Sequence, residues 1–266
     1  MALVAIDDAD DPRLAPYRAV RERDLVGRAG LFIAEGEVVL RLLVQRGRFP
    51  LQSLLVTERR LDPLRNLVAG LPADVPVYVV PQAVMDGVAG FAIHRGALGV
   101  GVRGEEPSMD HLLAGLPERA LVVGLVGIAN HDNVGGIFRN AAAFGAGAVL
   151  IDPATCDPLY RKAIRVSVGA ALVTPFARAD DPQALLAALD RHGFTTLALS
   201  PGGTRTLSEV RRAPRMAVLL GTEGPGLPAS ILARVETVRI PMAGDFDSLN
   251  VATTSGIVLH HLAAEA

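Results

Sequence analysis

The sequence predicts an α/β protein with a small α/β unit followed by a larger unit built on a parallel sheet. The 266 residues give enough length for two modest domains. In the second half of the chain, apolar strand-like runs alternate with helix-like segments, which is typical of a parallel sheet whose ligand site lies at the carboxyl ends of the strands. The first of these runs, residues 121–126, is apolar on both faces, as expected for a buried parallel strand.

The first unit covers residues 1–105, and its elements follow from hydrophobic periodicity. The stretch 37–46 predicts a helix because Val38, Val39, Leu42 and Leu43 recur at helical spacing. Strands are predicted where β-branched and apolar residues run between turn signals. In chain order we expect a strand over 31–34, a helix over 37–46, a strand over 53–57, a helix over 62–69, a strand over 77–80 that ends at Pro81, a helix to about 88 and a strand over 97–102.

A linker over residues 106–118 is predicted, because the polar segment 103–107 contains Gly104 and Pro107 between two apolar units. The second unit then covers residues 119–266. A final apolar helix is expected to reach about residue 262, with Ser248 able to cap it. The expected strands are 121–126, 148–151, 171–175, 196–199, 217–220 and 238–241.

The composition excludes several classes of protein. Half of the residues are hydrophobic and 20% are charged, so the chain can bury a core and is not disordered. No apolar run reaches the roughly 18 residues of a membrane-spanning helix, and the N-terminus begins with acidic residues where a secretory signal would be basic. We therefore expect a cytoplasmic protein. A single cysteine, Cys156, permits no intrachain disulfide, and the histidines have no metal-ligand spacing, so no metal is implied.

The charge pattern is compatible with nucleic acid but does not require it. A formal net charge of −2 argues against a protein that coats nucleic acid by charge alone. Lys162 is the only lysine, and every other basic residue is arginine, whose planar guanidinium contacts phosphate bidentately. A GC-rich genome would produce the same arginine bias, so both explanations stay open.

Residues 130–141 form the first of three motifs. They follow the buried strand and open a helix expected to reach about Phe144. Asn133 is placed where a helix N-cap would stand, and Gly135 and Gly136 allow close backbone approach. Arg139 follows by less than two turns, so it would not share a face with Asn133, although both could reach a ligand at the helix start. The alternative is a capped helix with one surface arginine.

The second motif, residues 219–228, is an apolar strand running into a glycine-rich loop that holds one carboxylate, Glu223. Such loops bring backbone groups against a nucleotide-like ligand. The loop matches neither the Gly-x-Gly-x-x-Gly fingerprint nor a Walker sequence, which disfavours a dinucleotide or nucleoside triphosphate site. An ordinary turn between a strand and a helix is the alternative.

The third motif, residues 239–251, places a strand ending at Pro241 before a short loop and the terminal helix. Taken alone, it could be a helix cap with Asn250 in the first turn. Each motif by itself is weak, but their combination and order are specific.

The three motifs together resemble those of the SpoU (TrmH) branch of the SPOUT methyltransferases. The likeness rests on Asn133-x-Gly135 with Arg139, on the loop 221–227, and on the third motif with Ser248, Leu249, Asn250 and Val251. The segments 32–36 and 94–96 are similar to that family's substrate-binding domain, which resembles ribosomal protein L30e. One departure is Ala252, where members often have serine, although Thr253 or Thr254 could substitute.

The resemblance implies an L30e-like RNA substrate-binding domain and a SPOUT domain with a C-terminal trefoil knot. It further implies a homodimer with the site near its interface, S-adenosylmethionine as cofactor, and methylation of the ribose 2'-oxygen in rRNA or tRNA. By the same resemblance the catalytic group is Arg139, Asn133, Glu223, Ser248 and Asn250. The implied cofactor residues are Leu199, Ser200, Pro201, Gly221, Glu223, Gly224, Ile240, Met242 and Leu249. RNA docking is expected at Arg18, Arg21, Arg23, Arg28 and Arg95.

Three alternative functions make different demands on these residues. A non-catalytic RNA-binding or ribosome-assembly protein could retain the fold, but it would be expected to lose residues such as Arg139 and Glu223. A SPOUT enzyme that methylates a base nitrogen is the second alternative, and the third motif favours ribose by resemblance. A dinucleotide-dependent oxidoreductase lacks its glycine fingerprint.

Overall fold

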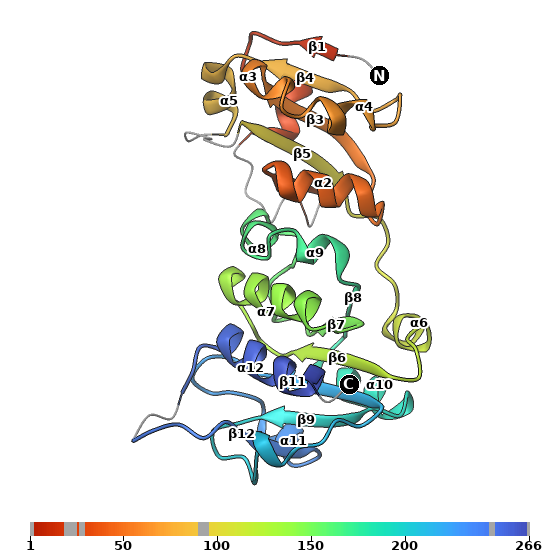
Figure 1. Ribbon diagram of the computed structural model, residues 1–266, viewed down its shortest axis with the longest axis vertical. Helices are drawn as coiled ribbons and strands as arrows, with labels where there is room; N and C mark the ends of the chain where they lie inside the picture. The colour runs from red at the N-terminus through yellow and green to blue at the C-terminus, as the bar shows by residue number, and fades with distance from the viewer. Residues whose placement is uncertain (1–2, 19–25, 27–29, 90–95, 245–247, 265–266) are drawn as a thin grey trace. The chain divides into compact units, whose positions relative to one another are not determined.

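The computed structural model describes residues 3–18, 26, 30–89, 96–244 and 248–264 (Figure 1). The chain divides into two compact units. The first is Met1–Glu105 with Leu159–Val173, and the second is Glu106–Pro158 with Thr174–Ala266. Residues 159–173 were expected from the sequence to belong to the second unit, whereas in the structure this segment packs with the first.

The first unit is a mixed sheet with helices. Its five strands lie in the order β1-β4-β3-β5-β2; β1, β4 and β3 are parallel, and β5 runs antiparallel to both β3 and β2. The strands are β1 Leu3–Ala5, β2 Leu31–Glu35, β3 Leu51–Thr57, β4 Val77–Val80 and β5 Ala97–Val102. The helices are the 3-10 helix η1 Pro12–Tyr17, α2 Glu37–Arg46, α3 Glu58–Leu61, α4 Arg65–Ala69, α5 Gln82–Ala89, α8 Arg161–Val166 and α9 Ala170–Val173.

Most of the elements predicted for this unit are confirmed. The helix over 37–46 has the expected bounds. The helix expected over 62–69 is present only as α4, from Arg65, and the separate short helix α3 precedes the predicted range. Helix α8 contacts β2 and α9 contacts α2, which explains why the later segment belongs here. Buried Tyr17 and Ser53 share a hydrogen bond of 2.7 Å between their hydroxyl oxygens, which satisfies both polar groups inside the core.

The second unit contains the predicted parallel sheet. Its seven strands are all parallel and lie in the order β10-β12-β9-β11-β6-β7-β8. Both centre strands, β6 and β11, are fully or almost fully buried, as their continuous apolar sequences predict. The strands are β6 Ala120–Leu125, β7 Ala148–Ile151, β8 Phe176–Arg178, β9 Thr195–Leu199, β10 Arg205–Thr206, β11 Arg215–Leu220 and β12 Glu236–Arg239.

One predicted strand was wrong. Residues 171–175 were expected to be extended, but helix α9 ends at Val173 and the strand β8 begins only at Phe176. Short apolar runs do not distinguish a buried strand from a buried helical turn by periodicity, and this run is an example.

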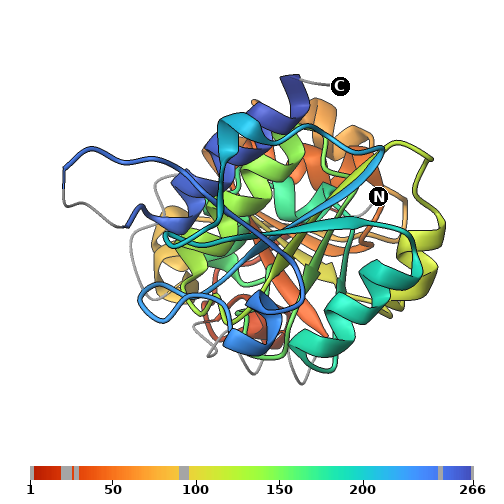
Figure 2. The same cartoon turned by 90° about the horizontal axis from the view of Figure 1, so that it is seen from below.

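Helices cover both faces of the parallel sheet. Helices α6, α10 and α11 share one apolar cluster with alternate strand residues such as Val122 and Leu219. On the opposite face, Phe138 of α7 meets Phe176 of β8 edge to face at 5.9 Å, and α7 and α12 lie side by side (Figures 1 and 2). The helices are α6 Met109–Ala114, α7 His131–Ala143, α10 Pro182–Arg191, the 3-10 helix η2 Leu207–Glu209, α11 Ala229–Leu232 and α12 Val251–Ala264.

Helix α6 lies within the residues that the sequence analysis assigned to a linker. Its Leu113 is fully buried in the apolar cluster of the second unit, and Met109 and Leu112 pack against the same cluster. The Gly and Pro residues that suggested a linker precede the helix rather than separate it from the core.

Among the described residues, every helix is too short or too polar to cross a bilayer, and no cluster of His, Cys, Asp or Glu is arranged to hold a metal ion. Burial, with a smaller contribution from nearby Asp157, raises the pKa of the Cys156 thiol to about 12. This thiol therefore stays protonated at neutral pH.

Arg215 is expected to be the main polar anchor of the second unit. Its guanidinium donates to the carbonyl oxygens of Leu113 (3.0 Å), Pro117 (3.0 Å) and His192 (2.9 Å), and it lies 4.4 Å from the centroid of the Phe194 ring. Arg215→Ala removes three hydrogen bonds to backbone carbonyls, two of them part-buried, together with the stacking, so we expect the free energy of unfolding to fall by about 2–4 kcal/mol.

Urea denaturation followed by circular dichroism measures this change. Arg234→Ala is the matched control, because its exposed ion pair with Asp190 is expected to contribute less than about 1 kcal/mol. Equal losses in the two variants would contradict the role given to Arg215.

Candidate functional site

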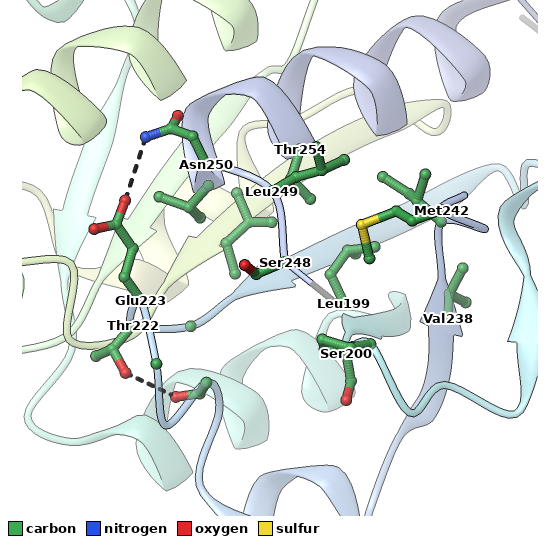
Figure 3. A pocket seen from close by; sticks show the side chains of 17 residues that line it. Leu199, Ser200, Thr222, Glu223, Val238, Met242, Ser248, Leu249, Asn250 and Thr254 are labelled. Atoms are coloured by element: carbon green, nitrogen blue, oxygen red, sulfur yellow. Dashed lines mark hydrogen bonds between the residues drawn. The ribbon is translucent and has the colours of Figure 1, made fainter. Parts of the chain in front are cut away.

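A cavity of about 430 Å³ lies at the carboxyl ends of β9, β11 and β12 (Figure 3). The turn after each strand contributes to its wall, and the start of α12 closes the remaining side. The carboxyl ends of parallel strands are where the strand–helix alternation predicted a ligand site. The lining residues are Leu199, Ser200, Pro201, Leu220, Gly221, Thr222, Glu223, Gly224, Gly226, Val238, Ile240, Met242, Ser248, Leu249, Asn250, Val251 and Thr254.

All nine residues expected at the cofactor line this one cavity. They are Leu199, Ser200, Pro201, Gly221, Glu223, Gly224, Ile240, Met242 and Leu249. Six lining residues were missed by the sequence analysis: Leu220, Thr222, Gly226, Val238, Val251 and Thr254. Three of these, Leu220, Thr222 and Val251, adjoin a residue that was named for the site from the sequence, so reading whole strand ends and loops would have found them.

Three of the predicted catalytic side chains form a hydrogen-bonded group at the edge of the cavity. Asn133 donates from Nδ2 to Glu223 Oε1 at 2.8 Å. Asn250 donates from Nδ2 to Asn133 Oδ1 at 2.9 Å. The same Nδ2 donates to Glu223 Oε1 at 3.2 Å (Figure 3). The three residues come from three motifs that are far apart in sequence, and the fold brings them together.

The helix caps differ from the sequence expectation. Asn130, not Asn133, caps α7, because its Oδ1 accepts from Asp132 N at 2.8 Å. Asn250, not Ser248, caps α12, because its Oδ1 accepts from Ala252 N (3.0 Å) and Thr253 N (3.2 Å). The Asn250 amide is therefore shared: its oxygen holds the helix while its nitrogen donates to Asn133 and Glu223.

The loop that carries Glu223 is closed on itself. Thr222 donates from Oγ1 to the Gly226 carbonyl at 3.2 Å, and Gly226 N donates to the Thr222 carbonyl at 3.1 Å. Gly224, with φ 88°, takes the left-handed conformation that a side chain would disfavour. A Cβ on Gly221 would lie 2.5 Å from the Gly226 carbonyl carbon, so glycine is required where the strand meets this loop. The tight loop fixes the carboxylate at the cavity.

Of the other two predicted catalytic residues, Ser248 lines the cavity and Arg139 does not. Arg139 is exposed on α7 and does not line it, and within the described part of the chain its guanidinium makes no hydrogen bond or ion pair. Six residues of helix turn the chain by about 240°, so Arg139 points away from buried Asn133, as the spacing predicted.

Of the arginines expected to dock RNA, only Arg18 lies among the described residues. Its guanidinium donates to the carbonyls of Ala9 (3.0 Å) and Asp11 (3.0 Å), contacts that favour a structural role in the first unit. Arg21, Arg23, Arg28 and Arg95 lie outside the described residues.

The chemistry of the wall restricts the ligand. Among the described residues of the lining, Glu223 is the only ionisable side chain, and these residues offer no cation to hold a phosphate. Leu199, Met242 and Leu249 supply apolar surface, and the loop backbone supplies polar groups. This combination suits a ligand with a flat apolar part and hydrogen-bonding edges but without a phosphate.

Known sequences similar to this chain are named as RNA methyltransferases. The family model described as "SpoU rRNA Methylase family" matches residues 120–260. A protein from Mycobacterium bovis named as an uncharacterized tRNA/rRNA methyltransferase is 42% identical over 262 residues, which cover 95% of this chain and 89% of the relative.

Solved structures share the fold over almost the whole chain. An AdoMet-bound rRNA methyltransferase from Sinorhizobium meliloti matches with a TM-score of 0.85 and 22% identity, covering 97% of both chains. An RNA 2'-O ribose methyltransferase matches with a TM-score of 0.80 and 26% identity, covering 98% of this chain and 99% of the other. At 22% identity the first of these shows similarity of fold alone.

Proposed function

Because this chain belongs to the SpoU family of RNA methyltransferases, we propose that it methylates the 2'-oxygen of a ribose in structured RNA, either ribosomal or transfer RNA. S-Adenosylmethionine is the cofactor, as in the AdoMet-bound relatives of the same fold. The observation that carries the ribose assignment is the Asn133–Glu223–Asn250 group beside the apolar cavity, together with the likeness to the RNA 2'-O ribose methyltransferase.

The cavity fits this cofactor. Its apolar side chains can cover an adenine ring, and the glycine loop offers backbone groups to the ring edge and ribose. In the described part of the wall no basic side chain is present, which suits a cofactor that carries a sulfonium and no phosphate. When bound, S-adenosylmethionine supplies an electrophilic methyl group. Leu199, Met242 and Leu249 would hold it, and Glu223 is the charge in the described lining that could complement a cation.

The amide group at the cavity edge provides alignment. Asn133 and Asn250 are held by Glu223 and by each other, so their polar atoms keep a fixed direction without paying for reorganisation. Such fixed dipoles can orient the ribose beside the methyl donor. Positioning of this kind contributes several kcal/mol to a transfer whose leaving group is already good.

Arg139 is proposed to clamp the neighbouring phosphate and to stabilise the alkoxide as it develops. A guanidinium keeps its proton in proteins, so Arg139 is not assigned as the base. Since it does not line the cavity of its own chain, we propose that the protein is a homodimer in which Arg139 serves the partner's cavity. The exposed side chain of Ile257 on the neighbouring helix α12 offers apolar surface for such an interface.

We further propose that the first domain, residues 1–105, is an L30e-like RNA-binding domain. Residues 119–266 are proposed to form the SPOUT domain with a trefoil knot, and the location is proposed to be cytoplasmic. Membership of the SpoU family supports the knot.

The test is transfer of radiolabelled methyl from S-adenosylmethionine to total rRNA and to total tRNA that lack this modification. We expect label in one pool, with resistance to alkali at the labelled linkage, because a 2'-O-methyl group removes the nucleophile for strand cleavage. Alkali-sensitive label would indicate base methylation instead. Cofactor binding without any transfer would favour the non-catalytic RNA-binding function.

A further inference from the structure

We propose that Asn140, outside the predicted catalytic set, is a positioning residue that fixes the start of helix α12 and thereby the Asn250 amide. The inference rests on the proposed function, because its catalytic consequence is measured by methyl transfer. Asn140 lies on α7 and does not line the cavity, so any effect on the reaction must pass through α12.

The contact of Asn140 with α12 is polar and specific. Its Nδ2 donates to the Ala252 carbonyl at 2.7 Å and to Ser255 Oγ at 2.9 Å. Ser255 is fully buried and donates in turn to the same Ala252 carbonyl at 2.7 Å. The Asn140 side chain is thus bound to the first turn of α12, immediately after Asn250.

The two helices approach too closely at this place for larger side chains. A Cβ on Gly136 would lie 2.7 Å from the Ala252 Cβ, and a Cβ on Gly256 would lie 3.2 Å from Asn140 Nδ2. At about 100° per residue, Asn133, Gly136 and Asn140 share one face of α7. The same face therefore carries the Asn250 contact at one end and the Ala252 contact at the other.

This arrangement determines the position of Asn250. The backbone carbonyl of Asn250 accepts from Thr254 N at 2.9 Å and its side chain caps the helix, so Asn250 moves with the first turn of α12. A shift of that turn along α7 would lengthen the 2.9 Å contact between Asn250 Nδ2 and Asn133 Oδ1. The Ala252 Cβ faces Gly136 at this crossing, and Ser255 supplies the hydroxyl at the interface.

The decisive experiment is a double-mutant cycle with Asn140→Ala, Asn250→Ala and the double variant, measured as kcat and KM of methyl transfer. We expect Asn140→Ala to lower kcat about 10-fold and to leave the KM for S-adenosylmethionine within about twofold. In the Asn250→Ala background the same change should have less than about a twofold effect, because its target is gone. Asn140→Asp, which keeps the volume but replaces the donor by an acceptor, should lose at least as much as Asn140→Ala.

A second measurement does not depend on activity. Amide hydrogen exchange in the first turn of α12, at Ala252 and Thr253, should become about 10-fold faster in Asn140→Ala, while the amides of residues 134–138 keep their rates. Ser255→Ala, which leaves the Asn140 contact with the Ala252 carbonyl, should change exchange by less than about threefold.

Additive effects in the cycle, or unchanged exchange at Ala252 and Thr253, would overturn the proposal. If the wild-type protein transfers no methyl group, the proposed function fails. In that case exchange still decides whether Asn140 holds the start of α12.

Discussion

Arg139→Ala is expected to lower kcat of methyl transfer by about 10²–10³-fold while binding of S-adenosylmethionine stays within about threefold. Loss of a group that stabilises developing negative charge typically has this cost. Cofactor affinity should be preserved, because Arg139 is exposed on α7 and does not line the cavity. Radiolabel transfer gives kcat, and isothermal titration calorimetry gives cofactor affinity. Arg139→Lys keeps the charge without the bidentate geometry and should recover only part of the rate.

Mixed dimers show which cavity Arg139 serves. Arg139→Ala and Glu223→Ala protomers are each expected to be nearly inactive as homodimers. A heterodimer of the two has one cavity with intact Glu223 facing an intact partner Arg139, so it should regain about half of the wild-type rate if the arginine acts across the interface. Heterodimers that form but regain no activity would place Arg139 at the cavity of its own chain.

Glu223→Ala is expected to lower kcat by about 10²-fold, which corresponds to about 2.7 kcal/mol. Glu223 Oε1 accepts from both Asn133 and Asn250, so its removal leaves two amides without the charged partner that orients them. A variant that keeps kcat within about threefold would contradict this role. Thermal unfolding of the same sample shows whether the fold is intact.

Glu223→Gln separates geometry from charge. The glutamine carbonyl can still accept from both amides, so a scaffold role predicts a rate much closer to wild type than that of Glu223→Ala. Equal losses in the two variants would indicate that the carboxylate charge itself takes part in the transfer, for example as the proton acceptor.

The parallel sheet could be predicted from sequence because its central strands carry an unambiguous signal. β6 and β11 are continuous apolar runs, and β9 follows a helix with regular spacing. The hydrophobic pattern does not predict secondary structure where several short elements follow one another. The run before β8 is helical because packing, not periodicity, decides a four-residue segment, and β10 has only two residues.

The sequence could predict which residues form the site, but not how these residues are hydrogen-bonded. The three motifs identified Asn133, Glu223 and Asn250, and the structure brings these side chains within 3.2 Å of one another. Sequence misplaced both helix caps by two or three residues, because several neighbouring polar residues can cap and only the backbone shows which does. Asn140 gave no signal, because an asparagine in the middle of a helix has no meaning until its partner is known.

Because Leu159–Val173 packs with the first unit, the two units do not correspond to two continuous pieces of the chain. The backbone passes from one unit to the other after Glu105, after Pro158 and after Val173, so the boundary is crossed three times. Cutting at residue 105 would remove α8 from β2 and α9 from α2, exposing apolar surface that the segment covers. A fragment that ends at residue 105 would therefore lack part of its own folding unit, and a fragment that begins there would carry α8 and α9 without the strand and helix they pack on.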